Sequence, residues 1–334
     1  MACLKISKFL WLLLLSVFLI ACGEDVTEDE EKSEVIYEKN QTVEGESYVA
    51  GDIEMVELIG EGCKDGEEYI EEEDICTLVL ECDDYESCIK WGNEIVVDLD
   101  DTYGSLILEE SVPTDLESLD VIATYDVDID TEEITTEDNI SQDTVDYHGG
   151  LWYSYAWLIP EYERPDMNRF EVFQSGDTLA HVYIHDEEAA SDWTLGMNNE
   201  NIELAFETMI TYIHEFAHLL SLCETEVDYY YPDSGCETSF IDERCFFEDA
   251  YMADYYNRFY SDGTLEATED NHATTSITED FAETFAHFVL SPQPAGDTLV
   301  EEKILFFYQY ENLVTLRAEI LSRAATWLDR TVID

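Results

Sequence analysis

The segment from residue 202 to residue 222 most constrains what this chain can fold into. Its apolar side chains lie on nearly every face of a helix, so we expect this helix to be buried. The same helix carries His214, Glu215 and His218 in the pattern His-Glu-x-x-His. Two histidines four residues apart share one helical face and can bind one metal ion, which satisfies polar groups that are otherwise costly to bury. The segment therefore predicts a buried metal-binding helix, with Glu215 placed to activate a water.

A second predicted helix, over residues 277–290, supplies a further ligand. Glu279, Glu283 and His287 are spaced by four residues and share one face. A glutamate from a second helix completes a zinc site whose third ligand is a carboxylate. We expect Glu279 to bind the metal and Glu283 to accept a hydrogen bond from the free ring nitrogen of one metal-binding histidine.

The start of this second helix leaves an alternative open. Thr278 is the predicted N-cap residue. In the alternative arrangement Glu283 binds the metal, and Glu279 forms a capping box with Ser276. His287 lies one turn beyond Glu283 and is predicted to be satisfied structurally rather than by the metal. We prefer Glu279 as the ligand because of a family resemblance.

The two motifs together resemble the gluzincin metallopeptidases. His-Glu-Phe-Ala-His at residues 214–218 is followed by Glu-Asp-Phe-Ala-Glu at residues 279–283. More narrowly, the pattern is similar to the catalytic domain of anthrax lethal factor and to zinc-binding metallopeptidase lipoproteins of bacteria. The resemblance implies an α+β, zincin-like catalytic domain with a small sheet and active-site helices. It also implies one Zn²⁺ per chain, held by the two histidines and by Glu279, with Glu283 behind them.

The resemblance implies hydrolysis of peptide bonds, with an endopeptidase as the expected enzyme. Glu215 would act as the general base on a metal-activated water. The lethal-factor pattern has a tyrosine seven residues before the ligand glutamate, where it stabilises the oxyanion, and this chain has His272 there. An imidazole can donate to an oxyanion, so His272 is the expected catalytic donor. Tyr255, Tyr256 and Tyr260 are the other candidates for this role.

Two other functions remain open. The chain could be a zinc-binding surface lipoprotein that turns over slowly or not at all and acts as a binding module. It could also be an acidic structural or Ca²⁺-binding lipoprotein in which His-Glu-x-x-His is accidental. Residues 126–130 alternate aspartate with aliphatic residues and could offer Ca²⁺ three carboxylates. They lack the glycine and terminal glutamate of an EF-hand loop, so we favour a solvated strand face over a Ca²⁺ site.

The charge of the chain excludes one class of partner. Its 334 residues include 14 Lys and Arg against 80 Asp and Glu, which gives a net charge of −66. Nucleic acid and anionic lipid headgroups both require basic patches, so we expect no nucleic-acid partner. The aromatic content of 13% is too high for a chain that is disordered throughout. The expected partner is a protein or peptide substrate.

The first 22 residues predict export. Lys5 and Lys8 precede an apolar run over residues 9–20, which is too short to span a bilayer comfortably and is typical of a signal peptide. The run ends in Leu19-Ile20-Ala21-Cys22, which resembles the lipobox of bacterial lipoproteins. The resemblance implies a lipid on Cys22 and an anchor in the bacterial cell envelope, at the outer membrane or the cell surface.

Composition divides the remaining chain into three parts. Residues 23–47 are predicted to be an acidic, disordered tether, and residues 48–145 a small β-rich, disulfide-containing acidic domain of unknown role. Residues 146–334 are predicted to be the zinc metallopeptidase domain. Strands are expected at residues 77–80, 94–97, 105–108 and 121–123 in the first domain. In the second we expect a helix at 151–159, paired strands at 170–173 and 180–185, and a strand at 193–197.

The cysteines predict disulfides, because export places them in an oxidising compartment. Setting aside Cys3 and Cys22 leaves seven of the nine. Four of the seven are expected to form two bridges by any of three pairings: Cys63, Cys76, Cys82 and Cys88. Cys236 and Cys245 are the favoured later pair, which leaves Cys223 as the odd cysteine.

Overall fold

The structure is a computed structural model that describes most of the chain from residue 63 to residue 331. The gaps fall at residues 65, 71–72, 74, 107–118, 130, 175–177, 187–188, 200–204, 231–234, 243 and 262–275. The predicted signal peptide, the lipidated Cys22, the acidic tether and His272 lie outside the described residues. Among the helices that the structure describes, none combines the length and the apolar character that crossing a membrane requires.

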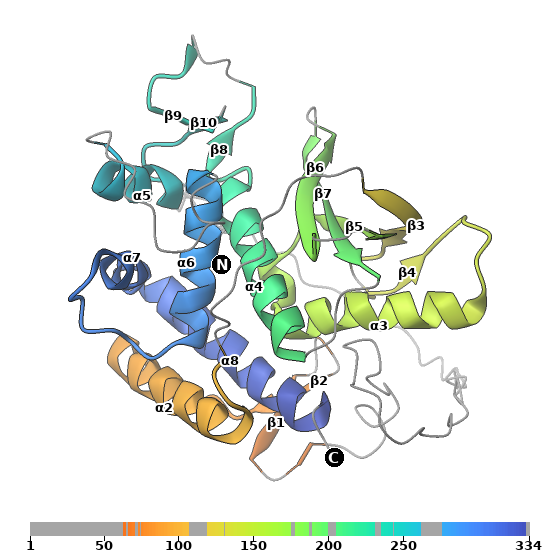
Figure 1. Cartoon of the computed structure of the whole chain (residues 1–334), viewed down its shortest axis with the longest axis horizontal. Coiled ribbons are helices and arrows are strands. Elements are labelled where there is room, and N and C mark those ends of the chain that lie inside the picture. The colour runs from red at the N-terminus through yellow and green to blue at the C-terminus, as the bar shows by residue number, and fades with distance from the viewer. Residues whose placement is uncertain are drawn as a thin grey trace, which may run out of the picture.

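The described residues form an α+β fold, as the sequence predicts (Figure 1). The helices are α2 (Tyr85–Tyr103), α3 (Gln142–Leu158), α4 (Ala205–Leu222), α5 (Tyr251–Phe259), α6 (Ile277–Leu290), α7 (Leu299–Phe307) and α8 (Glu311–Thr331). The strands are β1 (Glu67–Ile70), β2 (Ile75–Leu78), β3 (Asp120–Val127), β4 (Ile134–Thr135), β5 (Met167–Gln174), β6 (Ala180–Asp186), β7 (Ala189–Asn198), β8 (Val227–Asp228), β9 (Ser239–Ile241) and β10 (Arg244–Phe246). A single turn of 3-10 helix, η2 (Glu161–Glu163), follows α3.

The largest sheet has five strands in the order β4-β3-β5-β7-β6. Strands β5 and β7 are parallel, and the other neighbours in this sheet are antiparallel. The predicted pairing of residues 170–173 with residues 180–185 is wrong, because β7 lies between these two segments. Strand β6 forms its antiparallel pair with β7, and β7 is the neighbour of β5.

Helix α2 replaces the strand that was predicted at residues 94–97, so that prediction is wrong. Its buried side chains, Cys88, Trp91, Val96 and Leu99, recur at the spacing of a helical face rather than of a strand. Asp84 starts the helix with a capping box, in which its carboxylate accepts from the backbone N–H of Ser87. A run of three or four apolar residues does not distinguish the two structures when it is read alone.

Arg317 of α8 contacts both α2 and α6 inside the core. Its guanidinium is fully buried and donates to the backbone oxygens of Phe288 and Ser291, at 2.7 and 2.9 Å, at the C-terminal end of α6. A cation is favourable there because helix carbonyls converge at that end. Gly92 of α2 makes room for it, since a Cβ at this position would lie 2.3 Å from Arg317 Nη1. Helix α8 therefore anchors both α2 and α6.

The described residues on both sides of position 145 share one hydrophobic core. Strand β3 pairs with β5, and the β1–β2 hairpin packs on α8 (Figure 1). The N–H of Leu78 donates to Thr326 Oγ1 at 2.8 Å, and Arg323 pairs with both carboxylate oxygens of Glu73 at 2.8 and 2.6 Å. The predicted boundary at residue 145 thus falls inside a continuously packed unit.

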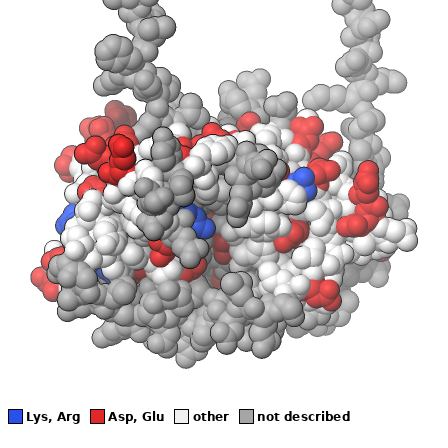
Figure 2. Space-filling model, turned by 90° about the horizontal axis from the view of Figure 1, so that it is seen from above, with Lys and Arg blue, Asp and Glu red and all other residues white. Residues whose placement is uncertain are grey.

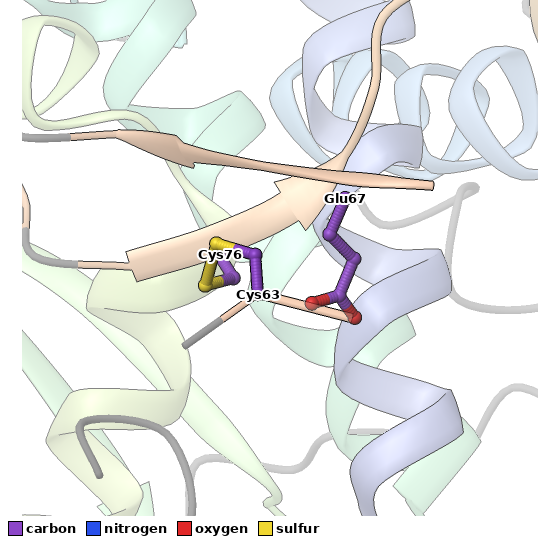
Figure 3. A group of neighbouring side chains, drawn as sticks. All are labelled: Cys63, Glu67 and Cys76. Atoms are coloured by element: carbon purple, nitrogen blue, oxygen red, sulfur yellow. A yellow bond between two sulfur atoms is a disulfide. The ribbon is translucent and has the colours of Figure 1, made fainter. Parts of the chain in front are cut away.

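Three disulfides brace the described chain. Cys63–Cys76 and Cys82–Cys88 confirm the two early bridges and select one of the three pairings, and Cys236–Cys245 confirms the later pair. Figure 3 shows Glu67 beside the first bridge. Because the sulfurs of Cys63 and Cys76 are bonded to each other, they are not thiolates that could hold a metal. Cys223 is buried just after α4 and is itself disulfide-bonded, so the prediction that it is the odd cysteine is wrong.

The surface is strongly acidic. Figure 2 shows carboxylate side chains over the described part of one face, with only a few Lys and Arg side chains among them. Asp126 and Asp128, in the acidic stretch that was considered for Ca²⁺, are exposed. Asp128 uses a carboxylate oxygen to accept from the backbone N–H of Thr131 at 3.1 Å, which stabilises a turn.

Candidate metal centre

Helices α4 and α6 lie side by side in the middle of the fold, and α4 also packs against β6 (Figure 1). The predicted burial of the α4 helix is confirmed. Its apolar side chains fill the core, and His214, Glu215 and His218 are 9%, 6% and 9% exposed. The first helix therefore holds three polar side chains in a setting where an unsatisfied group would be costly.

Three side chains from the two helices converge on one point. His214 Nε2 lies 3.2 Å from His218 Nε2 and 3.3 Å from a carboxylate oxygen of Glu279. His218 Nε2 lies 3.5 Å from the same oxygen. Zinc bonds of about 2.0–2.1 Å in a tetrahedral site would set ligand atoms roughly 3.3–3.4 Å apart. The spacing of these three atoms fits such a site closely.

Glu279 is the most accessible side chain of the group. The side chain of Glu279 is 26% exposed, whereas those of the two histidines are 11% exposed. Three protein ligands are the number found in a catalytic zinc site, whereas a structural site has four. Among the described residues, the other group of three potential ligands contains the Cys63–Cys76 disulfide, so the α4–α6 group is the candidate metal centre.

Glu283 lies behind His214, on the face that carries Glu279. One carboxylate oxygen is 3.5 Å from His214 Nδ1, and the other is 3.3 Å from His287 Nε2. Burial alone would raise the pKa of Glu283, but hydrogen bonds from His214 and His287 outweigh it and hold this pKa far below its usual range. The structure thus places Glu283 where the sequence predicts it, and gives it a second histidine partner.

The charge around His214 is unusual for a buried imidazole. Burial lowers its pKa, but hydrogen bonds to Glu279 and Glu283, together with the charge of Glu215, raise the pKa to about 10. In the absence of metal the site therefore holds a proton near neutral pH. A cation is favoured here, whether that cation is a proton or a metal ion.

The N-terminus of α6 fixes Glu279. The residue that caps this helix is Ser276, whose Oγ accepts from the backbone N–H of Glu279 at 3.2 Å, so the prediction of Thr278 as the cap is wrong. Asp242, at the tip of the β9–β10 hairpin, accepts from the N–H and the hydroxyl of Thr278 at 3.3 Å each. The carboxylate of Glu279 lies against the two histidines rather than folding back on Ser276. Of the two arrangements, the structure therefore brings Glu279, and not Glu283, into the group with His214 and His218 that could hold a metal ion.

A buried ion pair beside Glu279 was not predicted from the sequence. Lys303 Nζ lies 2.8 and 3.0 Å from the two carboxylate oxygens of Asp280, and both side chains are 1% exposed. Tyr255 and Tyr260 each donate to Asp280 at 2.6 Å. These two hydroxyls are thus held inside the core and are not oxyanion donors at the metal centre. A lone lysine within the apolar stretch 303–308 was the available signal.

Comparisons with protein-family models, with curated proteins and with solved structures give no match. The interpretation of the site therefore rests on its geometry and on the sequence motifs.

Proposed function

We propose that this chain is a zinc-dependent peptidase of the gluzincin type, with a zincin-like arrangement of its sheet and helices. The observation that carries the proposal is the separation of 3.2–3.5 Å among the ligand atoms of His214, His218 and Glu279. Two imidazoles and one carboxylate with an open fourth position form the ligand set of zinc hydrolases. Zinc is preferred over Ca²⁺ or Mg²⁺, since these ions bind mainly oxygen.

Zn²⁺ supplies, when bound, a Lewis acid that acidifies water and polarises a carbonyl group. The chain supplies the proton transfers. Glu215 is adjacent in sequence to His214 and is 6% exposed, so its carboxylate acts from a partly dry setting. It accepts the proton of the attacking water and gives it to the leaving amine. His272 is our proposed donor to the oxyanion.

Strand β6 offers a place for the substrate backbone. It is an edge strand of the five-stranded sheet, and it packs near α4, which carries the two histidines. An extended peptide can add to such an edge through main-chain hydrogen bonds. A substrate bound in this way would be an extended segment of a longer chain, and we therefore propose an endopeptidase.

We further propose that the enzyme is exported and held in the bacterial cell envelope by a lipid on Cys22. The three disulfides support export, since such bonds persist in oxidising compartments. The acidic surface agrees with a substrate that is a protein or peptide rather than nucleic acid.

The proposal is tested with a Glu215→Gln variant of the full chain. We expect wild-type protein to hold one zinc ion and to cleave a peptide library in a chelator-sensitive way. The variant should keep its zinc and lose at least about 10²-fold in turnover, because general base catalysis contributes this much. Glu224→Gln, at an exposed position just beyond α4, is the matched control and should cleave normally. Full activity in Glu215→Gln would overturn the proposed mechanism.

A second candidate is a zinc-binding surface lipoprotein without turnover. It is favoured by one observation, the presence of His272 where the lethal-factor pattern has tyrosine. Stoichiometric zinc in a wild-type protein that cleaves no member of the library would support this function. Absence of bound zinc would contradict both candidates.

A further inference from the structure

We propose that His287 is a positioning residue for the metal centre, which fixes the carboxylate of Glu283 and through it the ring of His214. This inference rests on the proposed zinc site and goes beyond its ligands. The observation is that the two oxygens of Glu283 face different imidazoles. One lies 3.5 Å from His214 Nδ1, and the other lies 3.3 Å from His287 Nε2.

The helix fixes the two residues relative to each other. His287 is four residues after Glu283, so the two side chains lie on one face of α6. The opposite face is locked into the core by Phe281, Phe285 and Phe288, none of which is exposed. Because the helix cannot rotate about its axis, the ring of His287 stays beside the carboxylate. A glutamate held through one oxygen can still turn about its last bonds, whereas one held through both oxygens keeps its plane.

The orientation of Glu283 decides which nitrogen of His214 is available to the metal. A carboxylate at Nδ1 keeps the proton on that nitrogen and leaves the lone pair of Nε2 directed at the metal. His214 Nε2 is the atom that lies 3.2 Å from His218 Nε2 and 3.3 Å from Glu279. His287 thus acts through Glu283 on the atom that binds the metal, without touching the metal itself.

The position of His287 makes the inference testable. Its side chain is 28% exposed, so it can be replaced without opening a cavity in the core. Glutamine has an amide N–H that can reach the same carboxylate oxygen, whereas leucine has a similar size and no donor. His287→Gln and His287→Leu therefore differ in the proposed hydrogen bond and in little else.

The experiment measures zinc affinity of the full chain by competition with a chromogenic chelator. Loss of an outer partner of a metal ligand costs about 10–100-fold in affinity, and we expect His287→Leu to lie near the lower end, at about tenfold, because it acts through one further residue. His287→Gln should stay within about threefold of wild type. The Co²⁺-substituted proteins give a second readout, in which only His287→Leu should shift the visible absorption bands. His185→Leu, at an exposed histidine on β6, is the control and should change neither quantity.

A double substitution closes the test. In a Glu283→Ala background, His287→Leu should cause no further loss of affinity, because its effect passes through Glu283. An additive loss there would refute the inference, and so would equal affinities and spectra for wild type and His287→Leu. A loss in His287→Gln as large as that in His287→Leu would also refute it. Failure of the wild-type protein to bind zinc would instead overturn the proposed function.

Discussion

Replacing Lys303 with methionine should destabilise the protein by about 3 kcal/mol or more. Breaking a buried ion pair from one side costs roughly 3–5 kcal/mol, because the remaining charge is left buried without compensation. Asp280 and Lys303 are both 1% exposed, so water cannot replace the lost ammonium group. Asp280 would keep the hydroxyls of Tyr255 and Tyr260, each at 2.6 Å, and these two hydrogen bonds place the expected cost at the low end of the range.

The assay is urea unfolding of the metal-free protein, analysed by linear extrapolation. The double variant Asp280→Asn/Lys303→Met removes both charges, so it should cost less than Lys303→Met alone. Lys90→Met is the matched control, because Lys90 pairs with Glu94 at 3.4 Å while both side chains remain exposed. Such a surface pair contributes about 0–1 kcal/mol. A loss below about 1 kcal/mol in Lys303→Met would refute the reasoning, and so would a double variant less stable than the single one.

Three further predictions concern the site, the sheet and the surface. The pKa of His214 is raised to about 10 in the metal-free protein. Protonated His214 therefore stabilises the metal-free fold fully at pH values below the usual histidine pKa, and this stabilisation is lost as the pH rises through about 10. Zinc binding at pH 7 should thus release about one proton from His214. Calorimetry in buffers of different ionisation enthalpy measures this release, and a value near zero would contradict the prediction. Gly196→Ala should lower the free energy of unfolding by about 1–3 kcal/mol, as measured by thermal unfolding. The new Cβ would lie 2.3 Å from the ring of His181 and would displace that ring from Glu171. Gly149→Ala in α3 is the control, because its Cβ meets no atom, and it should be neutral or stabilising. Because the net charge is −66, kcat/KM should be higher for cationic peptides than for anionic peptides. Raising the salt concentration from about 0.05 M to about 1 M should reduce this preference. If the ratio of the two kcat/KM values did not depend on salt, electrostatic steering would be excluded.

The two helices of the candidate metal centre could be predicted because their signal is local. His214 and His218 are four residues apart on an apolar helix, and Glu279 and Glu283 repeat that spacing on another. Periodicity alone then determines which side chains share a face. The ends of α4 and α6 also follow the predicted segments closely, as 205–222 and 277–290.

The incorrect predictions concern segments whose structure is determined by tertiary contacts. Residues 94–97 have the composition of a strand, but they lie on α2, where Val96 packs in the core. The order of strands in a sheet depends on long-range contacts. The sequence between β5 and β6 therefore does not indicate that β7 lies between these two strands in the sheet. The cap of α6 differs by two residues, because Thr278 is bound by Asp242 from a distant hairpin. None of these contacts can be read from neighbouring residues in the sequence.

The contacts between the β1–β2 hairpin and α8 limit how early in synthesis the protein can fold. Arg323 reaches Glu73 across 250 positions of the chain, and Leu78 and Thr326 are joined beside it. Closing a loop of this length carries a logarithmic entropy cost of about 5 kcal/mol, which local contacts cannot offset. During synthesis, the hairpin and α2 can pack on α8 only after α8, the last helix that the structure describes, has been made. A chain that stops short of α8 would expose the apolar faces of α2 and α6 together, and we expect proteases to degrade it.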